Sequence, residues 1–133
     1  MTTGVMLDGE ATSAGQGYRQ CYLTAQNGLR LAYRDYGHDL APGLPLLCLS
    51  GLTGQAGDFH HLASRLAAGR RVLALDYRGR GRSAYDRNWR NYRPEVYVGD
   101  ILDLAAATNL SRLVVVGTSL GGLLAMALAC VRP

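Results

Sequence analysis

The stretch VVVGTSLGGLLAMALA, residues 114–129, joins two apolar patterns through a single serine. The valines read as a strand buried on both faces, and the apolar run after Ser119 is long enough for a helix. Gly117 and Gly121 flank the serine in the pattern G-x-S-x-G. A strand that turns directly into a helix would place Ser119 at the carboxyl edge of a sheet, where open α/β folds hold their sites.

The residues around Ser119 are those that a sharp turn requires. Side chains two positions before and after the serine would collide, and we expect the serine itself in a strained backbone conformation. The helix that begins at Leu120 would point its first amides at negative charge forming beside the serine oxygen, and Gly122 is expected to leave room for close packing of that helix. Although the pattern is common in a chain with 17 glycines, its place between a strand and a helix favours a nucleophile elbow.

The rest of the chain alternates strands and helices. An antiparallel hairpin is expected over 18–37, with its turn at Asn27-Gly28. Further strands are expected at 44–50, 70–76 and 111–117, all buried, with helices at 58–69, 94–109 and 120–130. This alternation implies right-handed crossovers and a parallel sheet with helices on both faces. The predicted fold class is therefore α/β, with an N-terminal antiparallel hairpin ahead of parallel strands.

Length and composition indicate one globular domain. The chain has 133 residues, of which 48% are hydrophobic and 18% charged, ordinary values for a folded protein. Residues 1–17 are rich in Gly, Ser, Thr and Ala and are expected to form a disordered tail, which leaves the domain over 18–133. The start does not resemble a signal peptide, and no apolar run reaches about 18 residues, so we predict a cytoplasmic protein without a membrane partner.

Charge and cysteine usage do not indicate nucleic-acid or metal binding. The net charge is +4, and arginines crowd between residues 78 and 93 without a nucleic-acid motif, so we interpret them as a solvated surface and predict no DNA or RNA partner. Cys21, Cys48 and Cys130 lie far apart in apolar surroundings, which is typical of reduced, buried thiols. None has metal-ligand spacing, so no metal site is predicted.

From residue 18 to residue 133 the chain resembles the α/β-hydrolase family in its serine-nucleophile branch. Besides GTSLGG, the resemblance is carried by three motifs in the family's order, namely YRDYG at 33–37, LLCLSGLTGQAGDF at 46–59 and DYRGRGRS at 76–83. The resemblance implies the N-terminal half of that fold. It implies no cofactor, and a small-molecule substrate that carries an ester, thioester, lactone or related carbonyl group.

The resemblance also implies an oxyanion hole. The family usually has His-Gly after the strand at 44–50, and the residue after that glycine offers a backbone amide to the oxyanion. Here Ser50 stands in place of the histidine, ahead of Gly51. An amide belongs to no particular side chain, so the amides of Leu52 and Leu120 are the expected donors.

The loop DYRGRGRS has a competing interpretation as a dinucleotide loop. Gly79 and Gly81 begin a G-x-G pattern, but no helix starts directly after it, which argues against a Rossmann site. The resemblance makes this segment a structural loop instead, in which Asp76 and Arg78 are expected to hydrogen-bond the turn.

The implied mechanism is acyl transfer to water, in which a histidine removes the Ser119 proton and an acid orients the histidine. The family places the acid and then the histidine after the serine, yet residues 120–133 hold no Asp, Glu or His. We interpret His60 and His61 as a partly exposed pair that opens a surface helix, and Asp100 and Asp103 as the polar face of their helix. No triad acid or histidine is therefore assigned.

This gap leads us to interpret the chain as an N-terminal half, truncated after the nucleophile helix, with little or no activity alone. The strand at 111–117 would then be an exposed apolar edge, and we expect association through that edge or with a missing C-terminal half. The alternative is a non-catalytic binding or assembly module that keeps the hydrolase scaffold.

Overall fold

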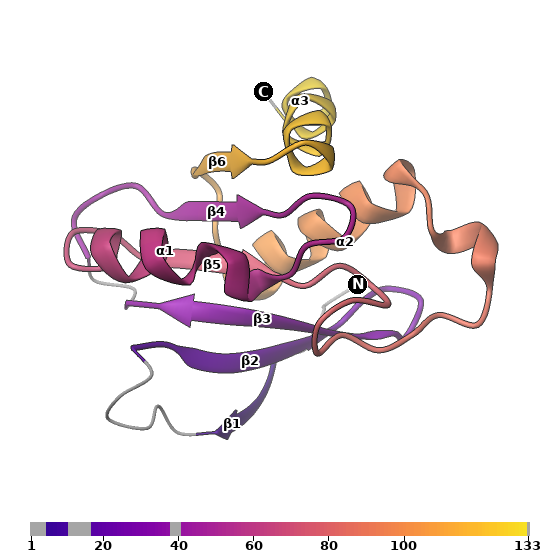
Figure 1. Cartoon of the computed structure of the whole chain (residues 1–133), viewed down its shortest axis with the longest axis horizontal. Helices are drawn as coiled ribbons and strands as arrows, with labels where there is room; N and C mark the ends of the chain where they lie inside the picture. The colour runs from indigo at the N-terminus through magenta and orange to yellow at the C-terminus, as the bar shows by residue number, and fades with distance from the viewer. Residues whose placement is uncertain (1–4, 11–16, 38–40, 133) are drawn as a thin grey trace.

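A six-stranded sheet organises the chain, with the strand order β1-β2-β3-β5-β4-β6 (Figure 1). The structure is a computed structural model that describes residues 5–10, 17–37 and 41–132. The strands are β1 (Val5–Glu10), β2 (Arg19–Thr24), β3 (Arg30–Tyr36), β4 (Leu46–Leu49), β5 (Val72–Leu75) and β6 (Val114–Gly117). The helices are α1 (His60–Leu66), α2 (Pro94–Ala107) and α3 (Leu120–Val131), with short 3₁₀ turns η1 (Ala56–Phe59) and η2 (Trp89–Asn91).

The sheet is antiparallel in its N-terminal part and parallel in the rest. β1, β2 and β3 pair antiparallel, and β3 also runs antiparallel to β5. β4 lies between β5 and β6 and is parallel to both. The predicted class, an antiparallel hairpin followed by parallel strands of an α/β fold, is confirmed.

Helices cover both faces of the sheet, and each face has its own core. On one face α2 and α3 pack over Leu47, Leu49, Leu73 and Leu75. On the other face η1 and α1 pack over Leu46, Cys48, Val72 and Ala74 through Ala56, Phe59 and Ala63. Every residue of β4 and β5 is buried, as expected for parallel strands covered on both faces.

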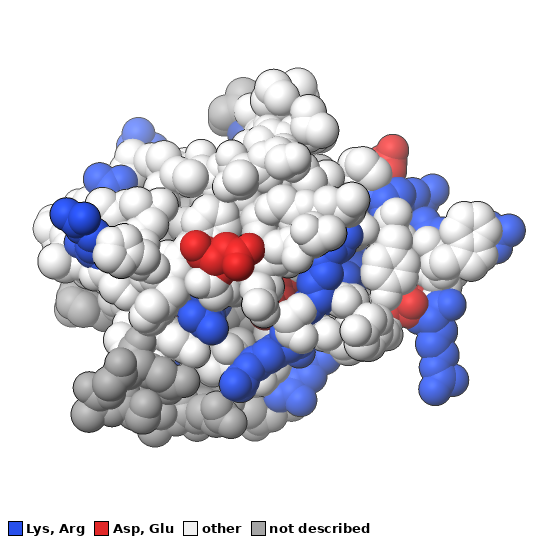
Figure 2. All heavy atoms as spheres, in the orientation of Figure 1, with Lys and Arg blue, Asp and Glu red and all other residues white. Residues whose placement is uncertain are grey.

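β6 differs from the fully buried strand that the valine run predicted. Its residues are only partly buried, and Val114 is 38% exposed. Within the described residues β6 pairs with β4 alone, which leaves its other edge without a strand. α3 beside it exposes Leu123 and Met126, and the surface over α3, at the top of Figure 2, shows few charged side chains. The valine pattern alone does not show this exposure, but the open edge agrees with the exposed apolar edge that was expected for this strand.

Two further expectations are corrected. Six residues of the expected N-terminal tail form β1, because they pair with β2 through contacts such as Val5 with Leu23. The parts of that tail at 1–4 and 11–16 lie outside the described residues. Cys21 and Cys48 are buried as expected, but Cys130 is exposed on α3, since the helix presents that position away from the sheet.

No helix in the described part of the chain is long and apolar enough to cross a membrane.

Candidate active site

Ser119 lies in the tight turn between β6 and α3, with its side chain exposed. Its backbone angles are φ 53° and ψ −111°, and a positive φ is uncommon for any residue other than glycine. The turn is closed by hydrogen bonds from the Thr118 amide to Leu49 O (3.0 Å) and from the Gly121 amide to Thr118 O (2.9 Å). The chain thus holds one hydroxyl outward in a backbone conformation that costs about 1–3 kcal/mol.

Gly117 and Gly121 leave no space for side chains. A Cβ at Gly117 would overlap the backbone of Gly121, and a Cβ at Gly121 would overlap the carbonyl group of Leu49. Gly122 differs, because a Cβ there would lie 3.5 Å from Gly117 O, an ordinary contact. Close packing therefore requires the two glycines of the G-x-S-x-G pattern but not Gly122, contrary to the expectation for that residue.

The loop after β4 lies against this turn. A Cβ built on Gly51 would be 3.8 Å from Ser119 Cβ and 3.7 Å from Thr118 O. β4 and β6 are neighbouring parallel strands, so their carboxyl ends bring Ser119 and the loop to the same edge. In the described part of the chain, the amides of Leu52 and Leu120 have no hydrogen-bond acceptor. Two amides without acceptors thus follow Gly51 and Ser119, the two residues that approach each other at this edge.

Two side chains of the loop after β5 hold the loop after β4. Tyr77 Oη donates to Ser50 O (2.7 Å), and Arg80 Nε donates to Leu52 O (2.7 Å). Burial raises the pKa of Tyr77 to about 12, so its hydroxyl keeps the proton that it donates. Sequence reasoning missed both residues, since the motif DYRGRGRS marks a structural loop but does not show which groups its side chains contact.

Ser50 itself is buried, at 1% exposure. Its carbonyl accepts from Tyr77, but its hydroxyl has no hydrogen-bond partner in the region that the structure describes. A buried hydroxyl without a partner is unfavourable by about 1–3 kcal/mol. Ser50 therefore contributes to the loop through its backbone rather than through its side chain.

Asp76 fixes the loop after β5. Its carboxylate accepts from the Ala56 amide (2.7 Å) and the Arg82 amide (3.1 Å), while Ser83 Oγ donates to its carbonyl (2.7 Å). The first of these bonds crosses to η1, and the second closes the turn. A Cβ at Gly81 would overlap the Asp76 carboxylate, so the turn folds tightly around that acid.

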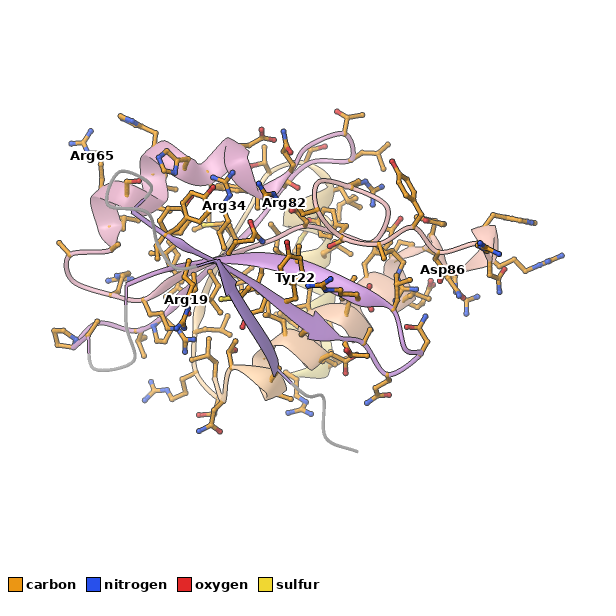
Figure 3. The ribbon with its side chains drawn as sticks, turned by 90° about the horizontal axis from the view of Figure 1, so that it is seen from below. Arg19, Tyr22, Arg34, Arg65, Arg82 and Asp86 are labelled. Carbon is orange, nitrogen blue, oxygen red and sulfur yellow. The ribbon has the colours of Figure 1, made fainter. Side chains whose placement is uncertain are left out.

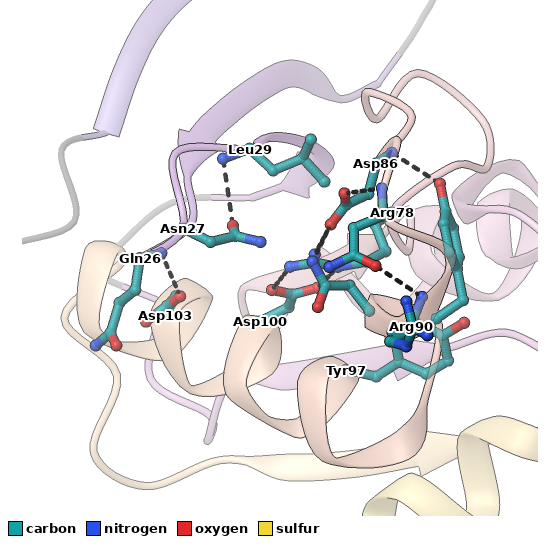
Figure 4. A network of polar contacts seen from close by, with 12 residues as sticks. Gln26, Asn27, Leu29, Arg78, Asp86, Arg90, Tyr97, Asp100 and Asp103 are labelled. Atoms are coloured by element: carbon teal, nitrogen blue, oxygen red, sulfur yellow. Dashed lines mark hydrogen bonds and ion pairs between the residues drawn. The ribbon is translucent and has the colours of Figure 1, made fainter.

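Arg78 does not bond the turn, which differs from expectation. Its guanidinium contacts α2, with Nε 2.8 Å from Asp100 Oδ2, and the segment just before η2, with Nη1 2.7 Å from Asp86 Oδ2 (Figure 4). Asp100 and Asp103 are buried rather than placed on a solvated polar face. Asp103 accepts from the Gln26 amide (3.0 Å) and so ties α2 to the hairpin. These acids are structural, since each already holds a partner.

An open cavity of about 370 Å³ lies beside this network, between the hairpin tip and α2. Ser119, Leu52 and Leu120 do not line it. The cavity therefore lies apart from the serine, and the geometry of the turn, rather than cavity size, identifies the candidate site.

No histidine of the described residues is placed as a partner of Ser119. His60 Nδ1 shares a hydrogen bond with Tyr36 Oη (2.9 Å), which also accepts from Arg34 (3.2 Å). His61 is exposed on α1, as expected, and His38 lies outside the described residues. The Ser119 hydroxyl does not cap its own helix. In the part of the chain that the structure covers, the serine lacks a base.

The arginines are distributed over several surfaces. In Figure 3 Arg65 lies at the left end of the molecule, Arg34 and Arg82 are labelled near its middle, and Asp86 lies toward the right. Several guanidinium groups rest on tyrosine rings, as for Arg30 over Tyr22 at 3.9 Å. Within the described residues no group of three or more potential metal-ligating side chains occurs.

Comparisons with known proteins place these features in a family. A family model described as the alpha/beta hydrolase fold matches residues 45–133. The 3-hydroxybutyrate-oligomer hydrolase of Cupriavidus necator is 40% identical over 114 residues, which cover 85% of this chain and 38% of that protein. An sn-1-specific diacylglycerol lipase of Xenopus tropicalis is 31% identical over 131 residues, covering 92% of this chain and 40% of that protein.

Solved structures agree with these matches. The crystal structure of an alpha/beta hydrolase from Novosphingobium aromaticivorans superposes with a TM-score of 0.84 at 46% identity, over 88% of this chain and 41% of that chain. The chain thus spans about two fifths of the length of the relatives that it matches.

Proposed function

The chain belongs to the alpha/beta hydrolase fold family, and from this premise we propose that it carries the nucleophile and oxyanion hole of a serine hydrolase. Ser119 is the proposed nucleophile, and the amides of Leu52 and Leu120 are the proposed oxyanion donors. The observation that carries the proposal is the positive φ of Ser119 between glycines that have no room for a side chain. A strained turn of this kind exposes a nucleophile at the carboxyl edge of the sheet.

The proposed reaction is acyl transfer to water. Ser119 Oγ attacks the substrate carbonyl carbon, its proton passes to a histidine, and the carbonyl oxygen becomes an oxyanion that accepts from the two amides. The oxyanion then collapses to an acyl-serine as the bond from the carbonyl carbon to the leaving oxygen breaks, and the departing alcohol takes the proton from the histidine. Water attacks the acyl-serine next, which releases the carboxylic acid and restores the Ser119 hydroxyl. His60 is engaged with Tyr36, so we assign neither the base nor the acid to the described residues.

Carboxylic esters are the substrate class that we propose first. Two relatives are named for an oligomer of 3-hydroxybutyrate and for diacylglycerol, and both of these compounds are esters. Thioesters and lactones undergo the same acyl transfer and remain within the proposal. The selectivity among them depends on groups that contact the acyl chain, which the turn at Ser119 does not supply.

A second candidate is a non-catalytic binding or assembly module. The observation that favours it is the absence of a base beside Ser119 in the described residues. The unpaired edge of β6 and the exposed apolar residues of α3 would then serve association.

For either candidate we propose a cytoplasmic protein, in keeping with the buried thiols of Cys21 and Cys48, which form no disulfide. We also propose that it has no nucleic-acid partner.

Labelling with a fluorophosphonate tests the nucleophile directly. The protein to use is the full product of the reading frame that contains residues 1–133, with an intact-mass measurement and Ser119→Ala as the control. We expect one adduct on the wild-type protein and none on the variant, together with hydrolysis of a p-nitrophenyl ester. A folded wild-type protein that acquires no adduct would contradict the hydrolase and favour the binding module.

A further inference from the structure

The peptide group between Gly51 and Leu52 carries one proposed oxyanion amide, and side chains from another loop hold the peptide groups on both sides of it. Tyr77 Oη bonds the carbonyl of Ser50, and Arg80 Nε bonds the carbonyl of Leu52, each at 2.7 Å. We propose that Tyr77 and Arg80 are positioning residues that aim the Leu52 amide at the oxyanion. This inference rests on the proposed hydrolase function.

We call the two hydrogen bonds from Tyr77 and Arg80 the clamp. They matter because few other contacts hold the loop after β4. Gly51 has the widest choice of backbone angles of any residue type, and the Leu52 side chain is 61% exposed. Among the described backbone groups, one hydrogen bond closes this turn, from the Gly54 amide to Gly51 O at 3.0 Å. A segment with few buried contacts samples many orientations unless hydrogen bonds restrict it. The two side-chain bonds therefore restrict the orientation of the peptide between them.

Arg80 is itself held in place. Its guanidinium lies 5.4 Å from the Tyr77 ring centroid and 5.3 Å from that of Tyr97. The two rings stack at 5.6 Å with an interplanar angle of 23°. Nη1 also lies 3.4 Å from Tyr97 Oη and 3.5 Å from Arg78 O. Contacts with α2 and with the loop after β5 thus restrict the rotamers of Arg80, and Arg80 in turn fixes the position of the Leu52 carbonyl.

The expected consequence concerns the transition state more than substrate binding. Removing one oxyanion donor lowers kcat by about 100- to 1,000-fold in a well-characterised hydrolase. A donor that is present but misaimed should lose part of that factor, so we expect Arg80→Met to lower kcat by about 10- to 100-fold. KM should change little, because the proposed role of the two side chains is to orient a donor that bonds the oxyanion and not to bind the ground-state substrate. Arg80→Lys keeps a donor on the same side and should recover much of the loss.

The test compares the rate of Ser119 phosphonylation by a fluorophosphonate with kcat and KM for a p-nitrophenyl ester. Wild type, Arg80→Met, Arg80→Lys and the exposed Arg87→Met are measured as full reading-frame products, with urea unfolding to check the fold. Support is a slowed Arg80→Met at an unchanged unfolding midpoint, a faster Arg80→Lys, and an Arg87→Met that behaves as wild type. Equal labelling rates and kcat for wild type and Arg80→Met would overturn the clamp while leaving the hydrolase intact.

A wild-type protein that does not label would overturn the hydrolase itself, and the clamp with it. Tyr77→Phe provides a second variant if Arg80→Met unfolds. It removes only the hydroxyl that holds Ser50 O, and we expect it to slow labelling and lower kcat with KM unchanged. A Tyr77→Phe protein with wild-type kcat would count against the clamp in the same way as a neutral Arg80→Met.

Discussion

The guanidinium of Arg78 is bidentate on Asp100, with Nε 2.8 Å from Oδ2 and Nη2 2.6 Å from Oδ1. Both side chains are buried. The pair connects the loop after β5, which also carries Tyr77 and Arg80, to the first turns of α2. The pair is therefore structural, and we expect its removal to lower the free energy of unfolding more than it alters the rate of any reaction at Ser119.

Arg78→Ala should lower the free energy of unfolding by about 3–5 kcal/mol, because it leaves the buried carboxylate of Asp100 without its partner. Urea unfolding followed by circular dichroism measures the change. Arg87→Ala is the control, since this exposed arginine should alter stability by no more than about 0.5 kcal/mol. A loss of less than about 1 kcal/mol for Arg78→Ala would show that the pair contributes little.

Gly121 and Gly122 are neighbours on α3 with opposite tolerance for a methyl group. Gly121→Ala places a Cβ against the Leu49 carbonyl, which no side-chain rotation relieves, so we expect a loss of about 3 kcal/mol or more. Gly122→Ala meets an ordinary contact and should be neutral or stabilise by up to about 1 kcal/mol. Unfolding midpoints of the two variants measure the contrast, and equal losses would contradict the close approach of α3 to β4.

Asp86 should make the loop that carries Trp89 sensitive to acid. Hydrogen bonds from Asn91 and the Asn88 amide, with Arg78 nearby, lower the pKa of Asp86. A lowered pKa means that the folded loop binds protons less readily than the unfolded chain. Its contribution to stability is therefore present above a pH of about 4 and is lost as the pH falls through the lowered value.

Trp89 is the single tryptophan of the chain and is 71% exposed, so its fluorescence reports on this loop. The emission should change below pH about 4 in the wild type, at pH values where the far-UV circular dichroism is still constant. Asp86→Asn should abolish that change. An identical acid transition in the variant would assign it to another carboxylate.

Ser50 and Ser83, which are both buried, should respond differently to truncation. Ser50→Ala removes a hydroxyl without a partner, so we expect stability within about 0.5 kcal/mol of wild type, or a slight gain. Ser83 Oγ accepts from the Ala32 amide (2.8 Å) and donates to Asp76 O (2.7 Å), so Ser83→Ala should cost about 1–3 kcal/mol. Thermal unfolding of both variants checks the difference, and similar losses would indicate a hidden partner for Ser50.

Local signals were sufficient for most of the fold. The alternation around Asn27-Gly28 predicted the pair β2 and β3, and the runs at 44–50 and 70–76 predicted two buried parallel strands. These signals work because periodicity and turn residues report on neighbours in sequence. The G-x-S-x-G pattern likewise predicted the turn at Ser119, since the steric demand on Gly117 and Gly121 is local.

Contacts between distant residues could not be predicted in this way. The sequence predicts Asp100 on the polar face of its helix, and only the folded chain brings Arg78 to it. The bond from Arg80 to Leu52 joins two loops whose spacing in sequence has no fixed meaning. The exposure of Val114 and Cys130 depends on which elements pack outside β6 and α3, which no periodicity encodes.

The position of β4 in the middle of the parallel strands also affects how the protein folds. The β2 and β3 hairpin closes a short loop, whereas the pairing of Leu46 with Val114 closes a much longer one at a larger entropic cost. We therefore expect β6 amides to gain protection from hydrogen exchange after hairpin amides during refolding. If so, the turn at Ser119 is among the last parts to form, and a partly folded chain would not display its reactive hydroxyl.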